Sequence, residues 1–241
     1  MTTPSSAKRK KITVINADDN ESIRARIEFT IKPLMFADAP EIEVVTLPGG
    51  PKLMETQENI DSVAAPLTKY IGTKPDTDVF IVACYADPGL AEARKAATGR
   101  KVFGINQSGM NTALALGDKV GVISISDAAV KRHLKYYESL GIMNRIAGER
   151  AMNIDLGDAA NSMDPTVALD PKVVADRMVE VAKELISDGA DVIVLGEGGM
   201  SPARDLLQAA IGIPVVDPTA AAVGMAIVAA TEFPLPPQPA K

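Results

Sequence analysis

The stretch Asp78-Val79-Phe80-Ile81-Val82-Ala83-Cys84 decides the fold, because it returns in closely similar form as Asp191-Val192-Ile193-Val194-Leu195-Gly196-Glu197. Each copy begins with an aspartate, continues through apolar residues and ends at a side chain that can carry a proton. A continuous apolar run of this length is typical of a parallel strand that is buried on both faces. The two copies therefore predict two buried parallel strands in equivalent places.

The repeat continues beyond these strands at the same spacing, with residue 78 set against residue 191. Residues 88–94 correspond to residues 201–207, and residues 102–104 correspond to residues 215–217. A weaker correspondence joins residues 12–16 to residues 120–124. The simpler alternative is that any two buried strands look alike. Because the register is kept through the following helix, the pattern instead indicates two related α/β lobes.

Strand-like and helix-like segments alternate along the rest of the chain, which is the pattern of an open, mostly parallel sheet covered by helices. The predicted strands span residues 11–16, 41–47, 78–83, 101–105, 119–124, 191–195 and 213–216. The predicted helices include one capped by the polar cluster at residues 18–22, and others at 56–71, 127–140, 171–188 and 201–210. We predict an α/β protein of two pseudo-symmetric flavodoxin-like lobes, with the active site in the cleft between them.

The lobes are expected to take unequal shares of the chain. We assign residues 11–115 and 218–233 to the first lobe and residues 116–217 to the second, and we expect residues 1–10 and 234–241 to form flexible tails. The prolines of the last segment cannot continue a helix. Residues 148–170 lack clear periodicity, and we expect a small helix and a loop over the site there.

Composition excludes several kinds of chemistry. Among 241 residues, 25 basic and 31 acidic side chains give a net charge of −6, so no overall field favours nucleic acid. One cysteine and one histidine exclude an intramolecular disulfide and a multi-cysteine zinc site. The longest apolar stretch, residues 220–230, is too short to cross a bilayer, and no secretory signal opens the chain. We expect a cytoplasmic protein without nucleic-acid or membrane partners.

The ends of the two repeated strands are the expected site, because ligands of open α/β sheets bind beyond the carboxyl ends of the strands. Cys84 and Glu197 occupy equivalent ends, one in each lobe, and would approach a shared cleft from opposite sides. The turn at residues 85–89 offers free amides that can hold an anion and lower the pKa of the thiol. The alternatives are that Cys84 is a small core residue and that Glu197 lies on a surface loop.

Two other features of the sequence give little indication of function. Gly196, Gly198 and Gly199 match neither a P-loop nor a dinucleotide fingerprint, which argues against a nucleotide site. His133 lies in a charged helical stretch, residues 129–135, and we expect it to be exposed and inert. A catalytic triad that depends on this histidine is therefore not expected.

Four stretches resemble the aspartate/glutamate/hydantoin racemase superfamily, and its hydantoin and allantoin racemase branch in particular. They are residues 12–16, 82–90, 194–200 and 214–217, and the resemblance extends in register from about residue 11 to residue 230. It implies an enzyme without a cofactor, in which two cysteines flank the substrate α-carbon. One thiolate removes the proton and the opposite thiol returns one. The first cysteine matches Cys84, whereas the second falls on Glu197, so the resemblance implies an unequal pair.

The resemblance also implies groups that hold the substrate. The substrate-binding candidates are Asn16, Tyr85, Ala86, Gln107, Ser124, Ser126, Gly198 and Gly199. Asn16 and Ser124 end equivalent strands, where the family uses polar groups to bind carboxylate or ring carbonyls. The residues after Cys84 and Glu197 would offer amides as anion or carbonyl holes. Gln107 stands where hydantoin-type members usually have an acidic residue, and Ser126 and Tyr136 are weaker candidates.

Three functions follow from this pattern. The first is a racemase or epimerase of a small carboxylate or hydantoin-like cyclic amide, with no cofactor or metal, in which Cys84 and Glu197 act as opposed acid and base. The second is a hydrolase, lyase or cis-trans isomerase in which Cys84 is the nucleophile and Glu197 the general base. The third is a non-catalytic small-molecule binder. Decarboxylation fits less well, because the family's decarboxylase keeps the other cysteine. We expect a homo-oligomer.

Overall fold

Two four-stranded parallel sheets form the centre of the molecule. The computed structural model describes residues 9–153 and 171–232. The first sheet has the order β2-β1-β3-β4, and the second has the order β6-β5-β7-β8. The strands of the first sheet are β1 Lys11–Asn16, β2 Glu41–Thr46, β3 Val79–Ala83 and β4 Lys101–Gly104. Those of the second sheet are β5 Val120–Ser124, β6 Ile146–Ala151, β7 Val192–Leu195 and β8 Val215–Val216.

The two sheets have the same topology, which confirms the repeat read from the sequence. In each sheet the first strand of the lobe lies between the second and the third, and the fourth is outermost beside the third. This is the strand order of flavodoxin-like folds without a fifth strand. β3 and β7, the strands of the quoted repeat, hold the same position and are fully buried.

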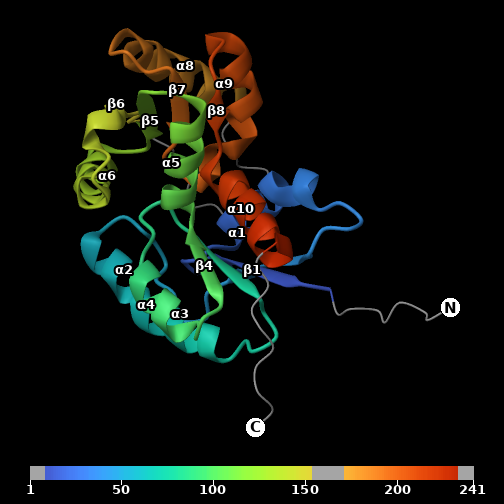
Figure 1. Ribbon diagram of the computed structural model, residues 1–241. Helices are drawn as coiled ribbons and strands as arrows, with labels where there is room; N and C mark the ends of the chain where they lie inside the picture. The colour runs from blue at the N-terminus through green and yellow to red at the C-terminus, as the bar shows by residue number, and fades with distance from the viewer. Residues whose placement is uncertain (1–8, 154–170, 233–241) are drawn as a thin grey trace, which may run out of the picture.

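Helices pack on the sheets and fill the space between them (Figure 1). Those of the first half are α1 Glu21–Ile31, α2 Gln57–Ser62, α3 Ala64–Gly72, α4 Leu90–Ala96 and α5 Ile105–Leu116. Those of the second half are α6 Asp127–Leu140, α8 Pro171–Ser187, α9 Arg204–Ile211 and α10 Pro218–Glu232. Short 3₁₀ turns lie at η1 Lys32–Leu34, η2 Met143–Arg145 and η4 Gly198–Ala203. The predicted helix at 56–71 is thus two helices, and the one at 201–210 begins as a 3₁₀ turn.

Local sequence explains where these helices begin. The side chain of Asn20 accepts a hydrogen bond from the backbone N–H of Ser22 and so caps α1, as the polar cluster predicts. Ser126 caps α6 in the same way, by accepting from the N–H of Ala129 at 3.3 Å.

β6 is a strand that the sequence analysis missed. It lies at the edge of the second sheet, where it pairs with β5, and most of its residues are half-buried. An edge strand of this kind needs no continuous apolar run, so the sequence Ile146–Ala151 gives little strand signal. The small helix and loop that we expected over the site fall on residues 148–170, of which 154–170 lie outside the described residues.

Two helices cross between the sheets. α5 follows β4 of the first sheet and packs against β7 of the second, whereas α10 follows β8 of the second sheet and packs against β3 and β4 of the first. The two helices also pack on one another (Figure 1). Gly109 permits this close approach, because a Cβ there would lie 2.8 Å from the Cβ of Pro218. The residue bounds that we assign to the two lobes stay a prediction.

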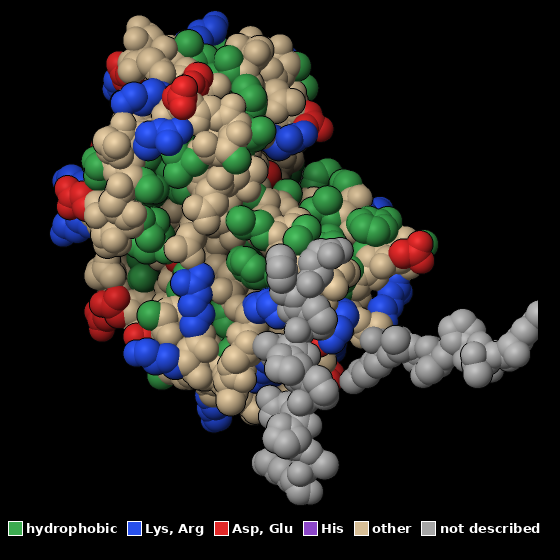
Figure 2. Space-filling view, in the orientation of Figure 1, with side chains coloured by type: hydrophobic (Ala, Val, Ile, Leu, Met, Phe, Trp, Pro, Cys, Tyr) green, Lys and Arg blue, Asp and Glu red, His purple; other side chains and the backbone are tan. Residues whose placement is uncertain are grey.

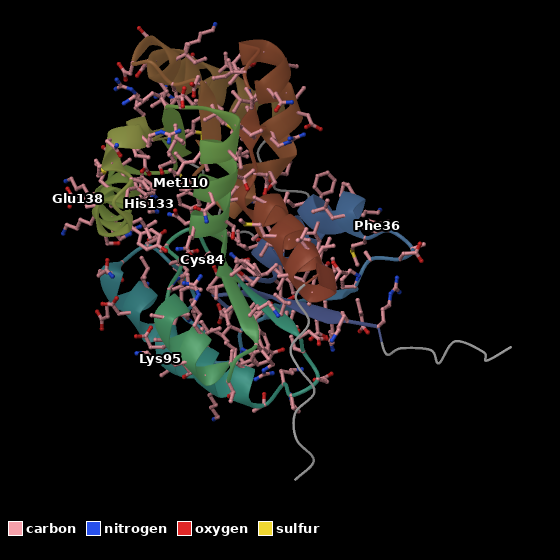
Figure 3. The ribbon with its side chains drawn as sticks, viewed as in Figure 1. Phe36, Cys84, Lys95, Met110, His133 and Glu138 are labelled. Atoms are coloured by element: carbon pink, nitrogen blue, oxygen red, sulfur yellow. The ribbon has the colours of Figure 1, made fainter. Side chains whose placement is uncertain are left out.

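The surface carries several exposed apolar side chains. Phe29, Met35 and Phe36 lie at the end of α1 and just after it, and Val228 lies on α10. Figure 2 shows apolar side chains gathered on this part of the molecule, near the Phe36 labelled in Figure 3. Self-association of the chain stays a prediction. Within residues 9–153 and 171–232, no helix has the length and apolar character that crossing a membrane requires.

Candidate active site

A small cavity lies where the carboxyl ends of β1, β3 and β7 meet, and Cys84 and Glu197 both line it. Its volume is about 50 Å³. The polar and charged residues around it are Asn16, Asp18, Cys84, Arg132, His133 and Glu197. Figure 3 places Cys84 at the centre of the molecule, between the two halves. The two side chains that the repeat singles out therefore face one enclosed space, from equivalent strand ends.

A backbone hydrogen bond fixes the chain after Cys84, and close packing of a glycine fixes the chain before Glu197. The carbonyl of Cys84 accepts a hydrogen bond from the N–H of Asp87 at 2.9 Å, and Asp87 has a left-handed φ of 46°. On the other side, Gly196 packs directly on β5. A Cβ there would lie 2.6 Å from Ser124 Oγ and 2.7 Å from the carbonyl oxygen of Ile123. Only a glycine allows Glu197 to follow β7 at this depth.

The thiol of Cys84 is held in its protonated form. Burial raises its pKa well above the ordinary value, and the charge of Glu197 raises it further. The backbone N–H of Ala86 donates to the sulfur and acts in the opposite direction. The turn amide therefore lowers the pKa of the thiol as expected, but burial and the neighbouring carboxylate outweigh it. The resting site contains a thiol.

The carboxyl groups of the cavity have raised pKa values as well. Burial raises the pKa of Glu197 and the charge of Asp18 adds to it, while His133, the N–H of Gly198 and Arg26 oppose the rise. Burial likewise raises the pKa of Asp18, against the hydrogen bonds from Asn20 and Asn16. A carboxylate whose pKa is raised towards neutrality is suited to removing a proton and to returning it.

Asn16 holds Asp18 in place rather than pointing freely into the cavity. Its Nδ2 donates to Asp18 Oδ1 at 2.8 Å and to the carbonyl of Asn20 at 3.1 Å. Sequence reasoning treated Asp18 only as part of a helix cap and missed it as a site residue. Its position two residues after the end of β1, at the same sheet edge as Cys84, was the available signal.

His133 is buried, so the prediction that it is exposed is wrong. It is 4% exposed and lines the cavity, and its Nδ1 lies 2.6 Å from Glu149 Oε1. Ser124 donates its hydroxyl to the same carboxylate oxygen. The charged residues around His133 had suggested an exposed position. In the structure α6 turns its charged residues outwards, while His133 and Tyr137, one turn apart, face inwards. Figure 3 shows Glu138 on the outside of the same helix.

Arg132 was also missed. It lines the cavity from α6, and its Nη1 donates to the carbonyl of Glu55 at 3.1 Å. Its Nε is buried and has no hydrogen-bond partner. In the sequence, Arg132 is only one more charged residue of a helical segment. Its place at the cavity depends on the fold and could not be read from the local sequence.

The predicted substrate-binding residues divide into two groups. Asn16, Tyr85 and Ala86 line the cavity, although the phenol of Tyr85 points away to Tyr137 Oη at 3.2 Å. The remaining candidates do not line it: Gln107, Ser124, Ser126, Gly198 and Gly199. The side chain of Gln107 accepts from Arg94 at 2.7 Å.

The cavity thus combines a thiol and two carboxyl groups from the strand ends with a histidine and an arginine from α6. Such a set can remove a proton from carbon, return one and stabilise the charge that forms between these steps. Within the described residues, no three His, Cys, Asp or Glu side chains come together as a metal site would require.

Comparison with known proteins finds similar sequences and a similar fold. A hydantoin racemase of Rhizobium meliloti is 36% identical over 155 residues, covering 64% of this chain and 61% of the relative, which is less than two thirds of its length. A hydantoin racemase of Pseudomonas sp. (strain NS671) is 27% identical and covers 90% of this chain and 84% of its own length. The solved structure of allantoin racemase from Klebsiella pneumoniae has the same fold, with a TM-score of 0.79 at 22% identity, over 93% of this chain and 89% of that one.

The profile of one protein family, described as Asp/Glu/Hydantoin racemase, matches residues 12–226. This range includes both sheets, apart from the first residue of β1, and all the charged residues of the cavity. The protein is therefore a member of the Asp/Glu/hydantoin racemase family.

Proposed function

We propose that the protein is a racemase or epimerase that inverts a stereocentre of a small hydantoin-like cyclic amide without a cofactor, using Cys84 and Glu197 as the opposed acid and base. The observation that carries this proposal is that both side chains line one small cavity from equivalent strand ends. The hydantoin and allantoin racemases among the similar proteins support the choice of substrate class.

The protonation of the site gives the order of events. In one direction the Glu197 carboxylate takes the proton of the substrate α-carbon, and the electrons of the C–H bond move into the adjacent carbonyl to form an enolate. The enolate then takes a proton from the Cys84 thiol on the opposite face, which leaves a thiolate. The site now holds a protonated Glu197 and a thiolate, which is the form that converts the other enantiomer. Because the pKa of Cys84 is raised, the thiol form is the resting one.

The charges in the cavity favour a ring over a dicarboxylate. Asp18 and Glu197 both line the space, so the two carboxylates of such a substrate would be the third and fourth there and would meet repulsion from like charges. The N–H groups of a cyclic amide can instead donate to these carboxyl oxygens. We therefore place small carboxylates second in the range of substrates.

The raised pKa of Cys84 also disfavours the reactions in which this residue is a nucleophile, because the thiolate is the nucleophilic form. Such a hydrolase, lyase or cis-trans isomerase would form a covalent adduct on the sulfur during turnover. Mass spectrometry of the protein quenched during turnover distinguishes the two mechanisms, because proton transfer leaves the mass of the chain unchanged.

The test uses enantiopure 5-methylhydantoin in D₂O, with allantoin as a second substrate and an enzyme-free blank for spontaneous racemisation. We expect deuterium at the ring carbon in the proton NMR spectrum and loss of the circular dichroism of the substrate, both faster than in the blank. Cys84→Ala should lose stereoinversion, whereas Glu138→Gln, on the outer side of α6, should not. Inversion that survives in Cys84→Ala would overturn the proposal.

A further inference from the structure

A buried chain of polar groups fixes the orientation of the His133 ring. Its Nδ1 pairs with Glu149 Oε1 at 2.6 Å, and the side chain of Glu149 is fully buried. Ser124 donates to the same carboxylate oxygen and lies 3.4 Å from Nδ1. Because Nδ1 is engaged with a carboxylate, it carries a hydrogen, and Nε2 is the ring nitrogen left for a ligand in the cavity. When the ring is protonated, Nε2 is a donor.

The residue before it, Arg132, brings a second unused donor to the same cavity. Its Nη1 is anchored on the carbonyl of Glu55, in the loop that also places Met54 at the cavity. Its Nε is buried without a partner among the described residues. A buried donor left unpaired costs free energy, and an acceptor oxygen on a ligand would recover it.

The two donors lie on α6, and the acid and base groups lie on the ends of β1, β3 and β7. We propose that Arg132 and His133 form the oxygen-binding wall of the site, donating to the carbonyl oxygen next to the stereocentre and stabilising the enolate that forms there. This inference rests on the proposed function, and it assigns a substrate contact to two residues that the racemase pattern of Cys84 and Glu197 does not include.

The reaction requires such a wall. When the C–H bond breaks, negative charge collects on the carbonyl oxygen, and Glu197 and Asp18 surround it with further negative charge. Hydrogen-bond donors already in position stabilise that oxygen more in the transition state than in the bound substrate. Glu149 acts through His133 as a positioning residue, because its contact with Nδ1 holds the ring turned towards the cavity.

The first test measures stereoinversion of 5-methylhydantoin in variants of α6. Removal of one oxyanion donor typically costs about 100- to 1000-fold in turnover, so we expect a loss of this order in kcat for Arg132→Met, with partial recovery in Arg132→Lys. Lys131→Met is the matched control, since it removes a cation from the exposed neighbouring position of the same helix. His133→Gln keeps a donor in the buried position and should lose less than His133→Leu.

The second test needs no substrate. Cys84 is the chain's one cysteine, so alkylation by iodoacetate and by iodoacetamide reports on this cavity alone. Both reagents react with the same sulfur by the same displacement of iodide, so a change in the pKa of the thiol cancels in the ratio of their rates. An oxygen-binding wall favours the carboxylate reagent. We expect the ratio of iodoacetate to iodoacetamide rates to fall about tenfold in Arg132→Met, a change that corresponds to about 1.4 kcal/mol, and to fall less in His133→Gln, which keeps a donor.

The two tests fail separately. If wild-type protein does not invert 5-methylhydantoin or allantoin but the alkylation ratio falls in the α6 variants, the proposed function is wrong and the oxygen-binding wall stands. The oxygen-binding wall is refuted by a different result. In that result wild-type protein inverts the substrate, and Arg132→Met and His133→Gln have the same inversion rate and the same alkylation ratio as wild type. Thermal melting shows whether each variant folds. If a His133 variant does not fold, the variants of the half-buried Arg132 provide the test.

Discussion

Tyr136 donates its hydroxyl to Oδ2 of Asp87 at 3.2 Å, and so ties α6 to the turn that follows Cys84. The carboxylate of Asp87 also accepts from the N–H of Asn106 at 3.0 Å and from the N–H of Gln107 at 2.9 Å, at the start of α5. One buried side chain therefore joins three segments that come together beside the cysteine. Burial raises the pKa of Asp87 to about 7, against the effect of these hydrogen bonds.

Loss of the proton from the buried Asp87 carboxyl group should make the protein less stable as pH rises. Its ordinary pKa is 3.8 and its folded value is about 7, so between these values the folded state binds more protons than the unfolded state. Stability then falls with increasing pH by at most about 1.4 kcal/mol per pH unit, and the loss is complete above the folded pKa. Urea denaturation from about pH 4 to pH 8 should show a shallower decline in Asp87→Asn than in wild-type protein.

Asp18, Glu197 and Asp217 have raised pKa values too, and so contribute to the slope in the same direction. The difference between Asp87→Asn and wild type isolates Asp87. Asp38→Asn serves as the control, because Asp38 is exposed. Equal slopes in Asp87→Asn and wild type would show that Asp87 is already ionised in the folded protein.

The charge of Glu197 should be visible in the reactivity of Cys84. Because that charge raises the pKa of the thiol, Glu197→Gln should lower it and speed alkylation by iodoacetamide at mildly alkaline pH. Each pKa unit removed raises the thiolate fraction about tenfold. The measurement is the alkylation rate against pH, followed by intact mass. An unchanged profile in Glu197→Gln would mean that the two side chains do not interact across the cavity.

Each member of the unequal pair should govern one enantiomer. Cys84→Ala should still exchange the α-hydrogen of the enantiomer whose proton faces Glu197, without inverting it, and Glu197→Gln should do the same for the opposite enantiomer. Chiral chromatography and NMR of both enantiomers of 5-methylhydantoin in D₂O check this. Exchange of both enantiomers by either single variant would show that one residue serves both faces.

The close approach at Gly196 should be intolerant of a methyl group. Gly196→Ala places a Cβ against Ser124 Oγ and the backbone of Ile123, so we expect a loss of about 1–3 kcal/mol in the free energy of unfolding and a displaced Glu197. Gly224→Ala, in the interior of α10 with no atom near its Cβ, should instead stabilise by about 0.5–1 kcal/mol. Thermal melting compares the two, and equal effects would contradict the packing at Gly196.

The sequence predicts those parts of the fold in which local pattern and burial agree. β3 and β7 are buried on both faces, so their continuous apolar runs identified them, and the side chains that follow reached one cavity. β6 escaped because an edge strand needs no such run. The strand ends shifted by only one or two residues, which is the usual uncertainty of such boundaries.

The site was predictable only where it repeats between the lobes. Cys84 and Glu197 are equivalent by register, whereas His133 and Arg132 come from a helix whose local sequence is mostly charged. Whether a charged helical residue points to solvent or to a cavity depends on which face of α6 packs inwards. The spacing of His133 and Tyr137, one turn apart and both buried, was the clue that could have identified that face.

The crossing of α5 and α10 has a consequence for the order in which the protein can form during synthesis. β4 ends at Gly104, but α10, which packs on β1, β3 and β4, begins at Pro218, more than a hundred residues later. At translation rates of about 5–20 residues per second, that face of the first sheet stays uncovered for on the order of ten seconds before α10 is synthesised. The first half of the chain therefore cannot mature as an independent unit on the ribosome, and chaperones that shield apolar sheet faces have a defined interval in which to act.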